Sequence, residues 1–299
     1  GELDAAAVEG IDIEVAPGGL SFGEVRSSEG DIRILARGTD ETLIPSASII
    51  EAASGNVTLT LGGSLDLQPT GAMVAAGEIE IIGDSLVADV TAADQGSKFS
   101  LFGELKAPVV TVSAVASQTV FNVGAVPHAS NVTLNSTGAN TSFAVGSTAP
   151  VAGGVLSGIA GKLNVLATGV GSSLSLDATG ASTGQQGTVG PSSVTGLGMP
   201  GFVGYGGIGL ESLAVHVGNG GDQVVVEGTN GNAGFVTEIY GGTGNDTIAT
   251  TGGEFHWTLT GVGDGTVGGN ANFSFAGIEN IDTGEQNDTV TFANDLARL

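Results

Sequence analysis

Glycine-rich turns that carry oxygen-bearing side chains are the segments of this sequence best suited to bind a ligand. Residues 241–249, Gly-Gly-Thr-Gly-Asn-Asp-Thr-Ile-Ala, follow the pattern G-G-x-G-x-D-x-U-x, in which U is apolar. The glycines allow open backbone angles that turn carbonyl oxygens inward, Asp246 adds a charged oxygen, and Ile248 enters the core. Calcium takes about six to eight oxygen ligands, so a second, stacked turn must complete the shell. The sequence therefore predicts a calcium-binding turn that contains Gly242, Gly244 and Asp246.

Two partial copies of this turn lie before and after it in the chain. The residues that keep the pattern are Gly218, Gly220 and Asp222 in the first copy and Gly284 and Asp288 in the second. The aspartates of the first copy and of the full pattern are 24 residues apart, which is close to the strand repeat described next. Because both copies are incomplete, the sequence predicts about one to three calcium sites. A metal-free turn held by its own side-chain hydrogen bonds is the alternative at each position.

A short strand phrase recurs upstream of these turns. Residues 30–35, 55–61 and 77–82 each place a glycine and a polar residue before an alternating apolar run, and their glycines are 25 and 22 residues apart. In the second phrase, alternation puts Val57, Leu59 and Leu61 on one face of a half-buried strand. A strand phrase every 20-odd residues predicts an all-β chain of stacked coils, a β-solenoid. Tandem β-sandwiches are the alternative, although such domains repeat at about 100 residues.

Two protein families resemble parts of this chain. The strand phrases over residues 10–180 are similar to the loose repeats of filamentous-haemagglutinin-like secreted proteins, which implies a right-handed parallel β-helix. The phrase Phe275–Ile281, which leads into the last partial turn, resembles its counterpart in haemolysin-type (RTX) calcium-binding proteins. That resemblance implies calcium-binding turns in the C-terminal third. The RTX repeats run in tandem, whereas here a single full match stands between degenerate ones.

Composition divides the chain into three predicted parts. Residues 1–180 carry the solenoid phrases, and residues 210–299 carry the RTX-like turns. Residues 181–209 are dominated by glycine, serine, threonine, glutamine and proline without periodicity, which predicts a loop or linker.

Charge limits the partners of this chain. It holds 31 acidic residues against seven Lys and Arg, a formal net charge of −24, and residues 164–299 contain Arg298 as their single base. Nucleic acid and anionic membranes are poor partners for such a surface, because phosphate binding needs Lys and Arg. Divalent cations are the natural counter-charge.

Enzyme chemistry finds little support. The chain has no cysteine, and its histidines, His128, His216 and His256, show neither metal-ligand spacing nor a nucleophile beside them. Arg33 and Arg37, which lie near acidic residues, would serve a polysaccharide lyase, but surface ion pairs are the simpler interpretation. No apolar run is long enough to span a bilayer, and the first residues lack the features of a signal peptide.

These observations predict a non-catalytic, extracellular β-solenoid of a bacterial surface or secreted protein. Its expected role is structural or adhesive, with calcium as cofactor and with self-association or neighbouring repeats as partners in a lattice or filament. A polysaccharide-binding or polysaccharide-processing β-helix protein is the alternative function.

Overall fold

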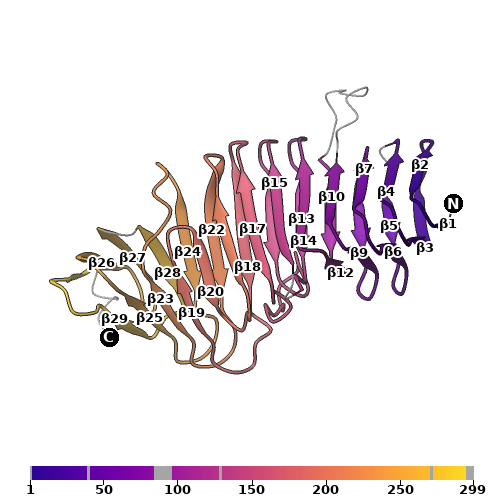
Figure 1. The fold of residues 1–299 in the computed structure, drawn as a ribbon. Coiled ribbons are helices and arrows are strands. Elements are labelled where there is room, and N and C mark those ends of the chain that lie inside the picture. The colour runs from indigo at the N-terminus through magenta and orange to yellow at the C-terminus, as the bar shows by residue number, and fades with distance from the viewer. Residues whose placement is uncertain (1, 39–40, 84–95, 128–129, 270–271, 294–299) are drawn as a thin grey trace.

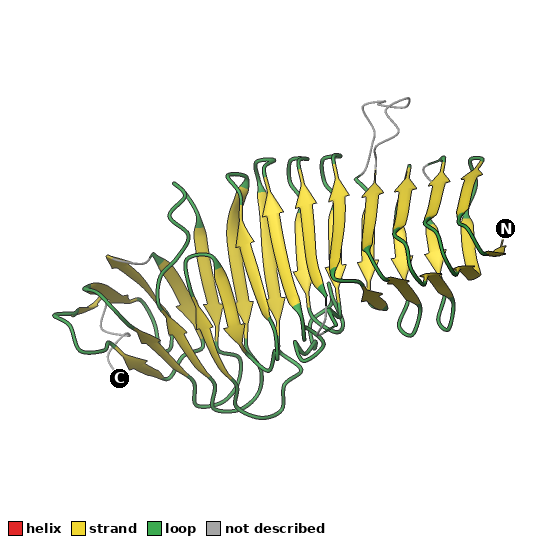
Figure 2. Ribbon diagram, viewed as in Figure 1, coloured by secondary structure: helices red, strands yellow, loops and turns green. Residues whose placement is uncertain are grey.

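Strands make up the regular structure of this chain. A computed structural model describes residues 2–38, 41–83, 96–127, 130–269 and 272–293, and within them 30 strands form two sheets (Figure 2). The strands lie side by side in a long row, with the two ends of the chain at opposite ends of it (Figure 1). In these ranges no helix is long and apolar enough to cross a membrane.

The larger sheet has 17 strands and the smaller has 13. The 17-stranded sheet comprises β1 (Glu2–Ala7), β3 (Leu20–Ser27), β5 (Thr42–Ile44), β6 (Ile49–Ala52), β8 (Leu65–Leu67), β9 (Ala72–Ala75), β11 (Lys98–Leu101), β12 (Glu104–Lys106), β14 (Val120–Val123), β16 (Ser142–Val145), β18 (Ser172–Asp177), β22 (Leu210–His216), β24 (Val236–Tyr240), β26 (Phe255–Leu259), β27 (Gly265–Gly269), β28 (Phe273–Ala276) and β30 (Thr289–Phe292). The 13-stranded sheet comprises β2 (Ile11–Val15), β4 (Ile32–Ala36), β7 (Val57–Leu61), β10 (Glu78–Gly83), β13 (Val109–Ala114), β15 (Asn131–Ser136), β17 (Lys162–Ala167), β19 (Gln186–Val189), β20 (Ser193–Gly196), β21 (Phe202–Gly206), β23 (Gln223–Val226), β25 (Thr247–Thr250) and β29 (Asn280–Asp282).

Most strands pair in parallel with a strand one sequence repeat before or after them, and we call one such repeat a coil. The three predicted strand phrases become β4, β7 and β10, which pair in register so that Ile32, Val57 and Ile79 form one buried column. The predicted alternation is confirmed in β7, where Val57, Leu59 and Leu61 are fully buried and the two threonines between them are partly exposed. Period-two alternation and a repeat near two dozen residues therefore fix which residues meet across coils.

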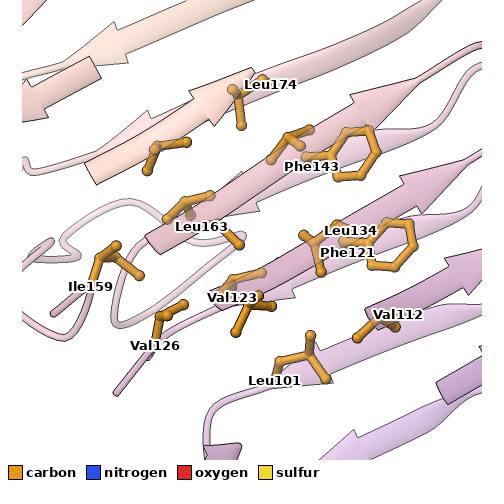
Figure 3. Close-up of a cluster of buried hydrophobic side chains, with 14 of the residues drawn as sticks. Leu101, Val112, Phe121, Val123, Val126, Leu134, Phe143, Ile159, Leu163 and Leu174 are labelled. Atoms are coloured by element: carbon orange, nitrogen blue, oxygen red, sulfur yellow. The ribbon is translucent and has the colours of Figure 1, made fainter. Parts of the chain in front are cut away.

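The core lies between the two sheets and is filled mainly by aliphatic side chains from both (Figure 3). Phe99, Phe121 and Phe143, from three successive strands of the larger sheet, stack with ring centroids 4.9 and 5.0 Å apart. Burial of one such ring stabilises the fold by about 1.5–3 kcal/mol, and stacking adds about 0.5–1.5 kcal/mol. The parallel coils thus place like side chains on top of one another.

The prediction that residues 181–209 form a loop is wrong, because strands occupy part of this segment. This segment contains β19, β20 and β21, which form an antiparallel meander inside the smaller sheet. Val189, Val194 and Val203 are fully buried there, and the hydroxyl of Tyr205 donates a hydrogen bond to the carbonyl of Gly190 at 2.5 Å. The strands are short and separated by glycines, so their alternation is hidden in the composition. The division of the chain into three domains stays a prediction.

The fold is all-β, as predicted, with two large and mostly parallel sheets. Both sheets continue across residues 181–209, because β17 connects through the meander to β23 and β18 pairs directly with β22. Tandem β-sandwiches, which are antiparallel, do not account for this pairing.

Candidate functional site

The first two predicted turns lie side by side in the structure. The turn before β23 contains Gly218, Gly220 and Asp222, and the turn before β25 contains Gly242, Gly244 and Asp246. Asn219 and Thr243 form a parallel bridge between them. The backbone N–H of Gly220 donates to the carbonyl of Thr243 at 2.9 Å, and the N–H of Thr243 donates to the carbonyl of Gly218 at 3.3 Å. The 24-residue spacing therefore corresponds to one coil.

Glycine is required where these turns touch. A Cβ atom on Gly244 would overlap the carbonyl oxygen of Gly220, and a Cβ atom on Gly242 would overlap that of Gly218. Both residues also have positive φ angles, 150° for Gly244 and 86° for Gly242, and residues other than glycine rarely adopt such angles. The glycines of the pattern thus allow one turn to stack on the next.

Stacking aligns three acidic side chains, Asp222, Asp246 and Glu279, which we call the carboxylate ladder. Strand pairing places Thr247 between Gln223 and Asn280, so the residue before each strand shares one corner of the coil. Each acid accepts a hydrogen bond from a backbone N–H of the preceding coil. The donors are Gln185 N–H to Asp222 Oδ1 at 2.5 Å, Asp222 N–H to Asp246 Oδ1 at 2.8 Å, and Asp246 N–H to Glu279 Oε2 at 2.8 Å.

The second oxygens of the two aspartates have no partner. Asp222 is 2% exposed and Asp246 is 1% exposed, and within the described residues neither Oδ2 atom has a hydrogen bond. Burial raises the pKa of Asp246, the N–H of Asp222 lowers it, and the negative charges of Asp222 and Glu279 raise it again. Ionised carboxylates buried in this way are costly unless a counter-charge is present.

The ladder offers hard oxygen donors, which suit a calcium ion. Within the ranges that the structure describes, no three His, Asp or Glu side chains converge as a metal-binding group. A calcium ion at this corner would therefore take most of its ligands from backbone carbonyls and water, with the unpartnered oxygens of Asp222 and Asp246 supplying the charge. The observation that suits such an ion is that the Oδ2 atoms of Asp222 and Asp246 are buried and unpartnered among the described residues.

The third predicted turn lies at a different corner of the coil. Asp288 precedes β30, which pairs with β26 in the larger sheet, whereas Asp222 and Asp246 precede strands of the smaller sheet. Its Oδ1 accepts the N–H of Phe255 at 2.7 Å, and Gly284 lies near the carbonyl of Thr250. Gly284 and Asp288 are therefore not brought together with the other two turns, because the chain has crossed to the other sheet by that point.

Glu279, which belongs to none of the three predicted turns, lies next to Asp246 at the end of the ladder. Sequence reasoning treated it as part of the lead-in phrase and missed its position at the end of the ladder. The signal was available, because Glu279 stands directly before the short strand β29, as Asp31 and Glu78 stand directly before or at the start of upstream strands.

The remaining polar candidates are dispersed. His128 lies outside the described residues. The ring of His216 stacks on Tyr240 at 4.5 Å, and His256 Nδ1 is 2.8 Å from Thr289 Oγ1. Arg33 pairs with Asp31 and Arg37 pairs with Glu14, as the simpler interpretation of the basic residues predicted.

Comparison with known proteins finds no matching family model, no matching curated protein and no matching solved structure. The resemblance to RTX and filamentous-haemagglutinin-like repeats thus stays a prediction from short motifs.

Proposed function

We propose that this protein is a non-catalytic, structural or adhesive β-solenoid of the bacterial surface or of a secreted bacterial protein, stabilised by calcium at its C-terminal turns. The carboxylate ladder carries the proposal. It combines two buried aspartates, each with an unpartnered oxygen, and no described Lys or Arg forms an ion pair with them. A bound cation is the simplest source of the missing counter-charge.

In-register stacking supports the solenoid part of the proposal. The chain returns repeatedly to each of the two sheets, and most described strands pair in parallel with a strand one coil away. Repeats of this kind bury a continuous core by contact with their neighbours alone. Long, regular molecules built in this way suit a stalk, a lattice or a filament.

Bound calcium would neutralise the buried carboxylates, and it would make full folding depend on the calcium concentration outside the cell. Extracellular calcium modules bind at roughly 10⁻⁴–10⁻³ M, so such a site fills outside the cell. A ligand that binds only the folded state stabilises it by about 2.7 kcal/mol when it is present at 100 times its Kd. The C-terminal coils would then reach full stability after export, where the ion is available.

A thermal melt of chelator-treated protein, titrated with calcium and separately with magnesium, tests the proposal. We expect calcium to raise Tm by a few degrees and magnesium to have little effect, since magnesium demands stricter geometry and holds its water more tightly. Light scattering in the same titration reports assembly. A melt that is unchanged by calcium would remove the metal from the proposal.

The best variant is Asp246→Asn, because it keeps an oxygen for the N–H of Asp222 and removes only the charge. The matched control is Asp31→Asn, at an upstream turn where Asp31 accepts the N–H of Asn56. Asp246→Asn should lose the calcium response and Asp31→Asn should keep it. If both variants respond like the wild type, calcium does not bind at the ladder.

Polysaccharide binding is the second candidate, and one surface feature favours it. Tyr240 and His216 follow the buried Ile239 and Val215 on neighbouring strands, so their stacked rings lie on the outer face of the larger sheet. The next residue in register beyond Tyr240 is the small Ala276, and Glu238 lies on the same face. An aromatic ring beside a carboxylate suits a sugar, through stacking and hydrogen bonding to its hydroxyls. Retention of the wild type on an immobilised neutral-glycan panel, lost in Tyr240→Ala, would support this function.

A further inference from the structure

The chain contains two Asn-Gly dipeptides, Asn219-Gly220 and Asn230-Gly231. In such a pair the backbone nitrogen of the glycine can attack the side-chain carbonyl carbon of the asparagine, because glycine has no side chain to obstruct the approach. The reaction depends on whether the local structure lets these two atoms meet. The two dipeptides are held very differently, so they form a natural matched pair.

Asn230 lies in the connection between β23 and β24, and its side chain is set up for attack. Its Oδ1 accepts the backbone N–H of Asn232 at 2.9 Å, which folds the side chain forward over the following peptide. A hydrogen bond to this oxygen also stabilises the negative charge that develops there when the carbonyl carbon is attacked.

Gly231 leaves its nitrogen free to react. The residue is exposed, and among the described residues its N–H has no hydrogen-bond acceptor. A Cβ atom built on Gly231 would meet nothing within 4 Å, so water and base reach this peptide bond.

Asn219 is held away from the same reaction. The N–H of Gly220 donates to the carbonyl of Thr243 at 2.9 Å, so the attacking nitrogen is occupied. The side-chain oxygen of Asn219 lies 2.6 Å from the hydroxyl of Thr243, which holds the side chain toward the next turn. Attack would require both contacts to break.

We propose that Asn230 is a site of spontaneous deamidation and that Asn219 is protected by the stacked turns. Base removes the proton from the nitrogen of Gly231, and that nitrogen forms a bond to the side-chain carbonyl carbon of Asn230. The protonated base then returns that proton to the side-chain nitrogen as the bond between this nitrogen and the carbon breaks, so ammonia leaves and a five-membered succinimide remains. Water opens the ring at either carbonyl, which yields aspartate or isoaspartate at position 230.

The product alters a loop that is tied to its surroundings. The neighbouring Thr229 hydroxyl accepts the N–H of Asn272 at 3.1 Å, and Asn232 donates to the carbonyl of Gly207 at 3.0 Å. Deamidation adds a negative charge beside these contacts, and isoaspartate lengthens the backbone between them. Modified molecules should therefore differ in charge and in the stability of this loop.

Peptide mapping by mass spectrometry on the folded, full chain tests the proposal. The protein is incubated in mildly alkaline buffer, and conversion of the peptides containing residues 219 and 230 is followed over time. We expect residue 230 to convert at least ten times faster than residue 219, with both aspartate and isoaspartate as products. Gly231→Ala, which fits because the site is open and the glycine has no positive φ angle, should slow the conversion at 230 by a similar factor.

A parallel incubation in denaturant separates structure from local sequence. With the turns unfolded, residues 219 and 230 should convert at rates that agree within a factor of a few. Equal rates in the folded protein, or an unchanged rate in Gly231→Ala, would overturn the proposal. Residue 219 remaining slow in denaturant would also overturn it, since protection would then not come from the stacked turns.

Discussion

At both ends of the smaller sheet, side-chain oxygens accept backbone N–H groups of neighbouring coils, but the residues that supply these oxygens differ. At the N-terminal end, Asp31, Asn56 and Glu78 align at one corner and form what we call the N-terminal ladder. There Asp31 Oδ1 accepts the N–H of Asn56 at 2.9 Å, and Asn56 Oδ1 accepts the N–H of Glu78 at 2.8 Å. Each side chain reaches toward the following coil, whereas those of the carboxylate ladder reach toward the preceding one.

The two ladders share a structural role and differ in charge and burial. In both, a side-chain oxygen accepts a backbone N–H that lies directly before a strand or at its first residue. Asp31 is 33% exposed and forms an ion pair with Arg33 at 2.6 Å, and the next position is a neutral amide. The aspartates of the carboxylate ladder are almost fully buried, and no Lys or Arg in the described part of the chain forms an ion pair with them. Hydrogen bonding alone therefore explains the N-terminal ladder, while the carboxylate ladder has charge that the structure leaves uncompensated.

The largest expected effect comes from disturbing the stacking itself. Gly244→Ala should lower the free energy of unfolding by about 2–4 kcal/mol, because the new Cβ overlaps Gly220 and the backbone has positive φ. Gly30→Ala, whose Cβ would overlap the carbonyl of Glu9, should cost about 1–3 kcal/mol. Urea unfolding measures both free energies. The calcium-dependent rise in Tm should change only in Gly244→Ala. Wild-type stability in Gly244→Ala would show that the turns do not stack as described.

Asp246→Asn should produce the next largest effect, and its sign should depend on calcium. In chelator we expect stability to be unchanged or higher by about 1 kcal/mol, because burial and the neighbouring acids already disfavour the charged form of Asp246. In saturating calcium the variant should fall below the wild type by about 1–3 kcal/mol, the increment that the ion supplies. Unfolding by urea in the two buffers gives both values. A loss of similar size in both buffers would mean that the side chain acts only through hydrogen bonding.

Asn56→Asp tests whether charge alone creates a metal site. It places a second carboxylate beside Asp31 and so copies the composition of the carboxylate ladder at the other end of the sheet. Because position 56 is exposed and Arg33 is near, the cost should stay below about 1 kcal/mol, with no calcium-selective rise in Tm. A calcium response equal to that of the wild-type C-terminal turns would show that burial is unimportant.

Local sequence patterns predicted the positions of several strands and which of their side chains are buried. Alternation identified β4, β7 and β10, and the 24-residue interval correctly stacked Asp222 on Asp246. Patterns failed where partners are set by the tertiary fold. Glu279 lies 33 residues beyond Asp246 because β26 and β27 are inserted before β28, the strand that pairs in parallel with β24, so no fixed interval points to it.

Dependence on the tertiary fold also explains why the sequence did not reveal that Asp288 lies apart from the other two aspartates, or that residues 186–206 form a meander. The same motif, a glycine followed by an aspartate and an apolar residue, can precede a strand of either sheet. Which acidic side chains become neighbours depends on the sheet that the following strand joins. In residues 186–206, glycines accept hairpin geometry and close backbone contact, which composition alone cannot distinguish from a loop.

The smallest expected effect is a pH dependence confined to the C-terminal half. Burial lowers the pKa of His216 below its ordinary 6.5, while Asp177 and Glu238 raise it in part. A base with a lowered pKa in the folded state contributes stability that is complete above the unfolded pKa and is lost as pH falls through that value. Acidification below about pH 6.5 should therefore weaken the contact between His216 and Tyr240, by less than about 1 kcal/mol since the ring is partly exposed. Hydrogen exchange should show faster opening of β22 and β24 but not of β4 and β7, and His216→Gln should remove the difference. Equal acceleration in both pairs would place the acid-sensitive group elsewhere.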